Sequence, residues 1–348
     1  MKILIINFEY PPLGGGGGVA TKDFGEELAR QHEVHVITTW FKGLKRYECV
    51  AGVHIHRVRV VGRQSLPTST LTSMITFVPA AVMTGIRLCR QNAFEVINAQ
   101  FVLPSGVPAV VLAKMFRLPL VVSFIGGDIY DPSKGVSPHR HWLLRSLIRF
   151  ISRQAIAGTA ISHDTKRRAE TLHGVSLPIT VTPLGLRPVS VAPTSRAALG
   201  LSDNSFLFIT IGRLIPRKGY EMLLSAWQDI PESLAIIGSG PLKKPLQELI
   251  KKYQLANRVR ILGYVEESTK NQMLRVADAY ISASNHEGFG IVFLEAMAAG
   301  LPIIALNDGG HTDFLTADEN ALLIPPQNPT ALQQAVRQLV ADHKLQER

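Results

Sequence analysis

Short apolar runs alternate along the chain with segments in which apolar positions recur every three or four residues. Lys2–Phe8 is the first apolar run, and it predicts a buried strand. Helical spacing over Ala20–Arg30 and a second apolar run over Val34–Thr39 follow. This order of strand, loop, helix and strand is typical of the opening of a doubly wound parallel sheet.

The same alternation continues to about residue 161. Leu143–Arg153 has helical spacing and places Arg145, Arg149 and Arg153 on one face. The longest stretch without a charged residue is Gln64–Ile86, and it contains two prolines and many hydroxyl residues. This stretch predicts a loop and a buried or interfacial helix rather than a membrane span. Further strands are expected at Val58–Val61, starting as early as His54, and at Val96–Ala99, Leu120–Ser123 and Ala157–Ile161.

A proline- and glycine-rich stretch, Pro183–Pro193, separates this half from a second one with the same alternation. We therefore expect two Rossmann-like α/β domains, 1–187 and 188–348, that face a central cleft. Ligands of such sheets bind at the carboxyl ends of the strands. In the second domain the expected strands are Phe206–Ile211, Ser233–Ile237, Val259–Leu262, Ala279–Ala283 and Pro302–Ala305, and the expected helices are Tyr220–Trp227, Leu242–Tyr253 and Ile291–Ala298.

Composition supports a globular chain and narrows its partners. Of the 348 residues, 46% are hydrophobic and 18% charged, which excludes a disordered or collagenous protein. Two cysteines, Cys49 and Cys89, exclude a disulfide framework, so the reducing cytosol is the default compartment. Residues 1–190 contain 22 Lys and Arg against 11 Asp and Glu, a net charge of +11, whereas 191–348 carry −1. A basic first half suits nucleic acid, an anionic membrane or a phosphorylated small molecule.

The glycine run Gly14–Gly18 joins the first strand to the first helix, where backbone N–H groups can approach an anion. Its spacing differs from the dinucleotide-binding fingerprint, and no acidic residue ends the second strand at Thr38 and Thr39. No Gly-Lys-Ser/Thr follows a glycine loop, which excludes a Walker A motif. A dehydrogenase or a P-loop enzyme is therefore disfavoured.

Two further clusters follow strands of the second half. Arg213 comes directly after Phe206–Ile211, and Lys218 precedes the next helix, so both cations suit a diphosphate. Glu287 and Glu295 lie eight positions apart around a helix start, where both could reach the same helix mouth. Carboxylates beside free helix N–H groups suit the hydroxyls of a sugar or a ribose.

With these motifs in this order, the sequence resembles the retaining, nucleotide-sugar-dependent glycosyltransferases of family 4, which have the GT-B fold. The resemblance covers nearly the whole chain. It rests on the glycine loop after the first strand, Gly212-Arg-Leu with Arg217-Lys-Gly219, Gly238-Ser-Gly-Pro241, Glu287 with Glu295, and Ala298-Ala-Gly-Leu-Pro302.

The resemblance implies that the first domain takes the acceptor and the second takes the nucleotide sugar. Arg213 and Lys218 would neutralise the donor diphosphate, Glu295 would bind the ribose, and Glu287 with the amides of Gly288–Ile291 would hold the sugar ring. The expected donor-binding residues are Gly16, Gly17, Gly18, Arg213, Lys218, Gly238, Gly240, Tyr264, Val265, Glu287, Gly288, Phe289, Gly290, Ile291, Val292 and Glu295, of which Glu287, Arg213 and Lys218 are expected to be catalytic. Gly126, Gly127, Asp128, Arg140 and Arg145 are expected on the acceptor side.

The reaction implied is glycosyl transfer with retention, in which a phosphate oxygen of the leaving group helps to deprotonate the acceptor. No Asp-x-Asp occurs in the sequence, so we expect no metal and no cofactor, with a UDP- or GDP-sugar as the substrate. The acceptor is expected to be a glycan or lipid-linked, and no nucleic acid is expected. We expect a cytoplasmic protein, peripheral at the inner membrane face if its basic residues meet anionic lipid. Candidates for such a basic face are Arg140, Arg145, Arg149, Arg153, Lys166, Arg167 and Arg168.

Three features depart from the family pattern. Ile125 stands where relatives often have a histidine, and Pro183-Leu-Gly-Leu-Arg187 lacks the usual Asn and Asp of the hinge. The final crossover helix is expected to be short or missing. Two alternatives therefore remain at this point, a non-catalytic nucleotide-sugar or membrane-surface binder and a nucleotide-sugar epimerase. Turnover with an acceptor separates both from a transferase.

Overall fold

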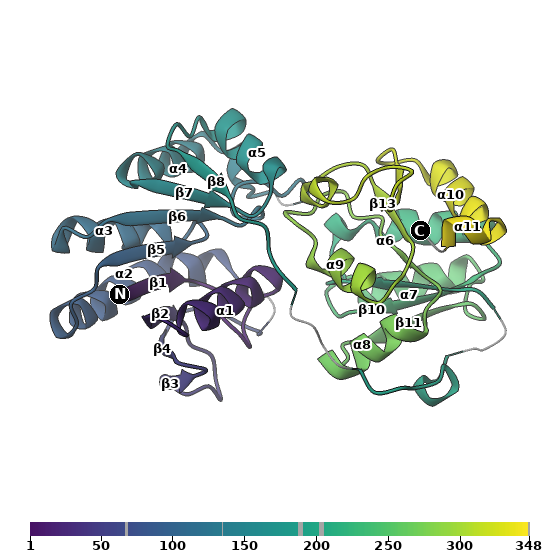
Figure 1. Cartoon of the computed structure of the whole chain (residues 1–348), viewed down its shortest axis with the longest axis horizontal. Helices are drawn as coiled ribbons and strands as arrows, with labels where there is room; N and C mark the ends of the chain where they lie inside the picture. Colours follow the sequence, from purple (N-terminus) through teal and green to yellow (C-terminus); the bar gives the residue numbers. More distant parts are fainter. Residues whose placement is uncertain (67–68, 134, 187–190, 202–204, 347–348) are drawn as a thin grey trace. The chain divides into compact units, whose positions relative to one another are not determined.

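The computed structural model describes residues 1–66, 69–133, 135–186, 191–201 and 205–346. The chain divides into two compact units, Met1–Leu184 and Gly185–Arg348 (Figure 1). The boundary predicted between residues 187 and 188 lies outside the described residues. As the sequence predicts, each unit is a Rossmann-like α/β structure built on a mainly parallel sheet.

The N-terminal unit contains an eight-stranded sheet in the order β3-β4-β2-β1-β5-β6-β7-β8. Neighbouring strands are parallel except for β3 and β4, which pair antiparallel. The strands are β1 (Lys2–Asn7), β2 (Glu33–Thr39), β3 (Tyr47–Val50), β4 (Val53–Val58), β5 (Val96–Gln100), β6 (Leu120–Phe124), β7 (Ala157–Ala160) and β8 (Ile179–Val181).

Successive residues of β1 belong to two different cores, because side chains alternate across a strand. Ile3 and Ile5 pack with Leu28 of α1, whereas Leu4 and Ile6 pack with residues of four other helices. Helix α1 therefore covers one face of the sheet and α2 to α5 cover the other, as right-handed crossovers in this strand order require (Figure 1). These helices are α1 (Gly16–Leu28), α2 (Leu71–Gln91), α3 (Gly106–Phe116), α4 (Trp142–Gln154) and α5 (His163–His173).

The C-terminal unit contains a six-stranded parallel sheet in the order β11-β10-β9-β12-β13-β14. Helices α6, α7 and α10 share one core with Phe208, and α8 and α9 share another with Leu207 and Ile209. The strands are β9 (Leu207–Ile211), β10 (Ser233–Ile237), β11 (Val259–Gly263), β12 (Ala279–Ile281), β13 (Ile303–Leu306) and β14 (Leu322–Ile324). The helices are α6 (Tyr220–Ala226), α7 (Lys243–Lys252), α8 (Glu267–Val276), α9 (Ile291–Ala298), α10 (Pro329–Ala341) and α11 (His343–Gln346).

Several element bounds differ from the prediction. Helix α1 begins at Gly16 rather than Ala20, so the glycine run supplies its first turn. Strand β4 ends at Val58, and the expected strand residues up to Val61 lie beyond it. The charge-free stretch does contain a helix, α2, which begins after a capping Thr70 whose side chain accepts a hydrogen bond from the N–H of Ser73.

Glycines allow the loops at the carboxyl ends of the C-terminal strands to meet backbone to backbone. Gly219, with a φ of +65°, lies so close to the β12–α9 loop that a Cβ there would be 1.9 Å from the carbonyl oxygen of Ala283. Gly238, after β10, would place a Cβ 1.9 Å from the carbonyl oxygen of Gly212, after β9. The positions of these loops therefore depend on residues without a side chain.

We expect Gly219→Ala to destabilise the C-terminal unit more than Gly300→Ala does. Both glycines have a positive φ, which disfavours alanine by about 1–2 kcal/mol. A Cβ at Gly300 meets nothing within 4 Å, whereas one at Gly219 overlaps a carbonyl oxygen and should add about 1–3 kcal/mol. Urea unfolding of the two variants measures the difference, and equal losses would contradict the close contact.

Candidate active site

Three cations lie on the loop that follows β9. Arg213 is the second residue after the strand, and Arg217 and Lys218 lie in the 3-10 turn Pro216–Lys218 that precedes α6. The Lys218 side chain folds back over Gly212. A Cβ atom on Gly212 would lie 2.9 Å from Cε of Lys218. The charge of Arg213 is near enough to act on that of Lys218. The sequence predicted Arg213 and Lys218 here and did not assign Arg217 a role.

Glu287 lies in the loop between β12 and α9, and only 6% of it is exposed. Its carboxylate forms an ion pair with the Lys218 ammonium, and its Oε2 atom lies 3.1 Å from Nη1 of Arg217. Burial raises the pKa of Glu287, but the charges of Lys218 and Arg217 outweigh burial and hold this pKa below its ordinary value. Glu287 is therefore charged, and it fixes two cations at the carboxyl edge of the sheet.

Glu295 lies in the second turn of α9 and has a cation of its own. Its Oε1 atom lies 2.8 Å from Nζ of Lys270, which is on α8 and also contacts Glu267 at 2.6 Å. Among the described residues, Oε2 of Glu295 has no hydrogen-bond partner. Burial raises the pKa of Glu295, and Lys270 offsets this only in part. Glu295 therefore has a buried oxygen that can accept a hydrogen bond.

The two glutamates were expected near one helix start, and in the structure each has a different cation as its partner. Glu287 is held by the loop after β9, whereas Glu295 is held by α8. Lys270 has no signal in the sequence, because it lies inside an ordinary polar helix away from any motif. Its role becomes visible only when α8 and α9 pack together.

The start of α9 has a glycine as its N-cap residue, which supplies no side chain to cap the helix. Gly290 is its N-cap residue, with a φ of +90°, and the N–H of Phe293 donates to its carbonyl oxygen at 2.9 Å. Gly288, Ile291 and Val292 are half-buried around it. The Phe289 side chain is buried against Phe314, so only its backbone remains for a ligand. This helix start thus offers backbone donors next to Glu287.

Two more loops of the expected donor site flank these residues. Gly240 packs on the loop after β9, since a Cβ there would lie 2.5 Å from the carbonyl oxygen of Leu214. Tyr264 follows β11 and is 73% exposed, whereas Val265 packs against the core. Of this pair, only the Tyr264 ring is available to stack on a planar group.

In the N-terminal unit, the loops after β1, β5 and β6 meet at the glycine run. Gly15 is the N-cap of α1 and supplies no side chain, and Gly16 and Gly18 lie with Gly17 in the first turn. A Cβ on Gly17 would lie 2.4 Å from the ring of Phe101 and 3.0 Å from Ile125. Ile125 therefore lies at the start of α1, at the position where the family pattern often has a histidine.

Asp128 connects the loop after β5 to the loop after β6 through hydrogen bonds. Its carboxylate accepts hydrogen bonds from the N–H groups of Val102 at 2.7 Å and Ile125 at 3.1 Å, and it is buried. Gly126, with a φ of +101°, and Gly127 form the turn between Ile125 and Asp128. The sequence placed Asp128 on the acceptor side, and in the structure its carboxylate accepts backbone hydrogen bonds and so positions these loops.

The basic residues expected near the acceptor do not form one group with Asp128. Arg140 donates to the carbonyl of Pro132 at 2.9 Å, and Arg145 is exposed on α4. Arg167 and Arg168 both form ion pairs with Asp164 on α5. In the described contacts, none of these side chains joins Asp128.

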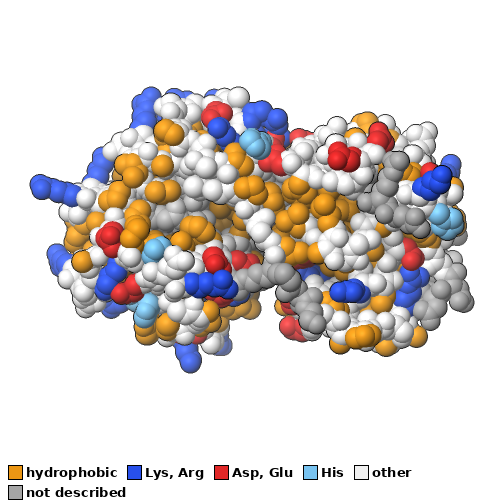
Figure 2. All heavy atoms as spheres, in the orientation of Figure 1, with side chains coloured by type: hydrophobic (Ala, Val, Ile, Leu, Met, Phe, Trp, Pro, Cys, Tyr) orange, Lys and Arg blue, Asp and Glu red, His pale blue; other side chains and the backbone are white. Residues whose placement is uncertain are grey.

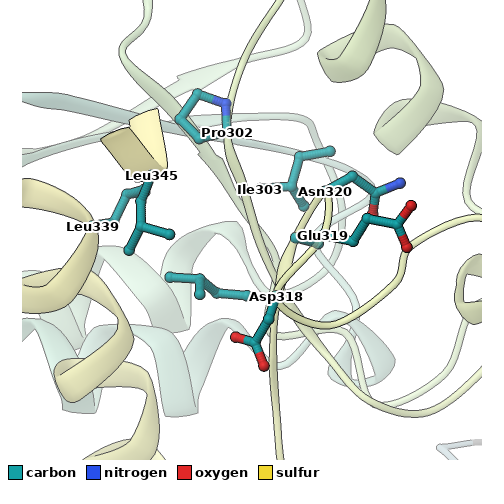
Figure 3. A pocket seen from close by; sticks show the side chains of 9 residues that line it. Pro302, Ile303, Asp318, Glu319, Asn320, Leu339 and Leu345 are labelled. Carbon is teal, nitrogen blue, oxygen red and sulfur yellow. The ribbon is translucent and has the colours of Figure 1, made fainter. Parts of the chain in front are cut away.

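A small pocket lies in the C-terminal unit, away from the strand-end loops of that unit (Figure 3). It has a volume of about 20 Å³, room for about one water molecule, and its lining includes Pro302, Ile303 and Leu339. Ile303 begins β13, so the pocket is at the amino end of the strands, opposite the candidate site. Among the described residues, no group of three or more His, Cys, Asp and Glu side chains could hold a metal ion.

We expect Asp128→Asn to change how stability depends on pH. Burial raises the pKa of Asp128 from 3.8 to about 6, although four backbone hydrogen bonds lower it. The folded chain therefore binds more protons between pH 4 and 6, and Asp128 stabilises it less as the pH rises through this window. Asparagine cannot titrate, so the stability of the parent should fall by about 2 kcal/mol relative to that of the variant between pH 4 and pH 7.

Urea unfolding at several pH values measures this difference, with Glu27→Gln, an exposed change on α1, as the control. A difference between parent and Asp128→Asn that stays constant with pH would show that Asp128 is not held in the environment described.

Comparisons with known proteins agree with the two-unit architecture. Residues 15–185 match the family "Glycosyl transferase 4-like domain", and residues 191–348 match "Glycosyl transferases group 1". An uncharacterized glycosyltransferase of Methanocaldococcus jannaschii is 28% identical, with 98% of this chain and 90% of the relative covered. A mannosyltransferase of Mycolicibacterium smegmatis, described as a GDP-mannose-dependent alpha-(1-6)-phosphatidylinositol monomannoside mannosyltransferase, is 25% identical over 98% of this chain and 89% of its own.

Solved structures show the same fold. Sucrose-phosphate synthase from Thermosynechococcus elongatus superposes with a TM-score of 0.85 at 23% identity, covering 100% of this chain and 91% of that one. HepE of Anabaena, solved in complex with UDP and glucose, gives a TM-score of 0.78 at 19% identity over 100% and 92%. The two family matches follow one another along the chain and together cover nearly all of it, and the chain therefore belongs to glycosyltransferase family 4, with the GT-B fold.

Proposed function

We propose that this glycosyltransferase moves a sugar from a UDP- or GDP-linked donor to a glycan or lipid-linked acceptor, with retention of the anomeric configuration. The cation cluster on the loop after β9 carries the proposal. Arg213, Arg217 and Lys218 bring three positive charges, and Glu287 neutralises one of them. Such a cluster of cations at the carboxyl ends of the strands suits the two negative charges of a nucleotide-sugar diphosphate.

The second carboxylate supports a nucleoside in the same site. Within the part of the chain that the structure describes, Glu295 has a buried oxygen without a hydrogen-bond partner, and a ribose hydroxyl can donate to it. Lys270 holds the other oxygen and so keeps the carboxylate in place. Tyr264 supplies an exposed ring at the next loop, on which a base could stack.

In the proposed reaction, the bond between the anomeric carbon and the diphosphate oxygen breaks, and a bond from that carbon to the acceptor oxygen forms on the same face. The acceptor proton passes to an oxygen of the leaving phosphate. Lys218 and Arg213 stabilise the charge that develops on that phosphate. Glu287 is ion-paired with its pKa held low, so it positions cations and the sugar ring rather than removing a proton.

The relatives include one that uses a GDP-sugar and one that binds UDP, so they are consistent with either nucleotide in the donor. The mannosyltransferase of Mycolicibacterium smegmatis is described as GDP-mannose-dependent. The structure of Anabaena HepE contains UDP and glucose. The proposed donor is therefore a UDP- or GDP-sugar, and the base is the first property to measure.

Calorimetric titration with UDP, GDP, ADP and their sugar conjugates tests the donor site. We expect one base to bind, and Arg213→Ala and Glu295→Ala each to weaken its binding about tenfold or more, because each loses a hydrogen bond to a charged group. Arg337→Ala and Glu319→Ala, both at exposed positions of the same unit, serve as matched controls. Binding that the four variants weaken equally would place the nucleotide elsewhere.

Stereochemistry tests the reaction itself. We expect proton NMR of the enzyme with its donor to show first the anomer that the donor carries, whether the sugar passes to an added acceptor or to water. An inverted first product would rule out retention. A changed nucleotide sugar formed without an acceptor would identify an epimerase instead.

A further inference from the structure

We propose that the outer side of α2, α3 and α4 docks on the surface of an anionic lipid bilayer. These helices lie side by side on one face of the N-terminal sheet (Figure 1). We call their exposed side the three-helix surface. The inference concerns this surface alone and does not depend on the identity of the donor.

The three helices form one continuous layer. A Cβ on Gly85 of α2 would lie 2.2 Å from Leu112 of α3, so these helices touch closely. A Cβ on Gly106 of α3 would lie 2.8 Å from Ile151 of α4. At the outer side, Nζ of Lys114 lies 5.4 Å from the centre of the Phe150 ring, which joins the surfaces of α3 and α4.

Large apolar side chains protrude from this layer. On α4, Trp142 is 72% exposed, and Leu143 and Phe150 are exposed on the same side of the helix. On α2, Ile75 and Met83 are exposed, eight residues apart. Tryptophan and other large apolar residues on an amphipathic helix are typical of insertion at the boundary between headgroups and acyl chains.

All charged side chains of the three helices are positive. None of the three helices contains an Asp or a Glu, although residues 1–190 contain 11. Such a surface attracts anionic headgroups while its apolar side chains enter the bilayer. Basic side chains at the edge of the N-terminal unit are visible in Figure 2. The exposed cations of the layer are Arg87, Arg90, Lys114, Arg145 and Arg153, and a sixth, Arg149, is half-buried and donates to the carbonyl of His173.

Helix α2 adds an independent observation. Among the described residues, it is the one helix long and apolar enough to cross a membrane, yet only 28% of its apolar 18-residue window is buried. It does not need to span, because Phe77, Ala81 and Leu88 anchor it in the N-terminal core. Its exposed apolar side is therefore available to a bilayer while the fold stays intact.

Other occupants fit this surface less well. A second copy in a two-fold arrangement would bring six cations against six cations, which repel each other. A nucleic acid would match the charge, but its phosphates offer nothing to bury the exposed Trp142 and Met83 side chains. A bilayer with anionic lipid satisfies both the charge and the apolar side chains.

Co-sedimentation of the full chain with vesicles tests the proposal. We expect binding to phosphatidylglycerol–phosphatidylcholine vesicles and little binding to pure phosphatidylcholine, with loss of binding as salt rises. Arg145→Gln with Arg153→Gln should weaken binding about tenfold or more, since each cation contributes about fivefold. Trp142→Ser with Phe150→Ser should weaken it by a similar factor, because both side chains would no longer enter the bilayer.

Matched controls separate this surface from overall charge and hydrophobicity. Lys251→Gln with Arg337→Gln removes two exposed cations from the C-terminal unit, and Tyr47→Ser removes an exposed aromatic side chain from β3. Both controls should bind vesicles within about twofold of the parent.

Fluorescence reports the orientation directly. The chain has three tryptophans, of which Trp227 is buried and Trp142 is largely exposed. Anionic vesicles should shift the emission to shorter wavelengths, and Trp142→Phe should abolish that shift while vesicle binding persists.

Three results would overturn the proposal. The first is a folded parent that does not bind anionic vesicles at low salt. The second is vesicle binding that the controls weaken as much as the variants of the three-helix surface do. The third is self-association in sedimentation velocity that those variants abolish, which would assign the surface to a second copy. Nucleotide-sugar binding is measured without vesicles, so failure here would leave the proposed reaction untouched.

Discussion

The buried carboxylate of Glu287 is the interaction on which the C-terminal site depends. Arg217 and Lys218 lie on one short turn, and without a counter-ion their charges would repel each other in a poorly solvated place. Glu287 comes from a different loop, after β12, so the same ion pair also ties two strand ends together. The charge balance of the site and the shape of its loops therefore have a common origin.

That ion pair forms only because backbone segments approach closely beneath it. Gly212 leaves room for the Lys218 side chain, and Gly219 lets the turn rest against Ala283. In the N-terminal unit, the close approach of loops depends on Gly17 and on the hydrogen bonds that the Asp128 carboxylate accepts. In both units, therefore, glycines at close backbone contacts and a buried carboxylate position the loops at the strand ends.

Much of this was predictable from local patterns. Apolar runs located most buried strands, because a strand covered on both faces has few polar positions, and Arg213, Lys218, Glu287 and Glu295 stood in recognisable motifs. Strand β3 was missed because it is short, polar and exposed at the sheet edge. Helix α3 was missed because it is apolar on nearly every side and has no stripe to detect. The partnership of Lys270 with Glu295 depends on packing between two helices, which no local pattern encodes.

The pair between Lys218 and Glu287 also means that Lys218 has a counter-ion that belongs to the protein itself. A cation that already has a counter-ion attracts small anions weakly, so phosphate or chloride gains little by entering. A ligand with two negative charges and several hydroxyls gains more, because its charges bind the cations while its hydroxyls donate to the glutamates. Because Glu287 stays beside Lys218, this cation has a counter-ion both with and without a bound diphosphate, and solvent ions are not needed to stabilise it.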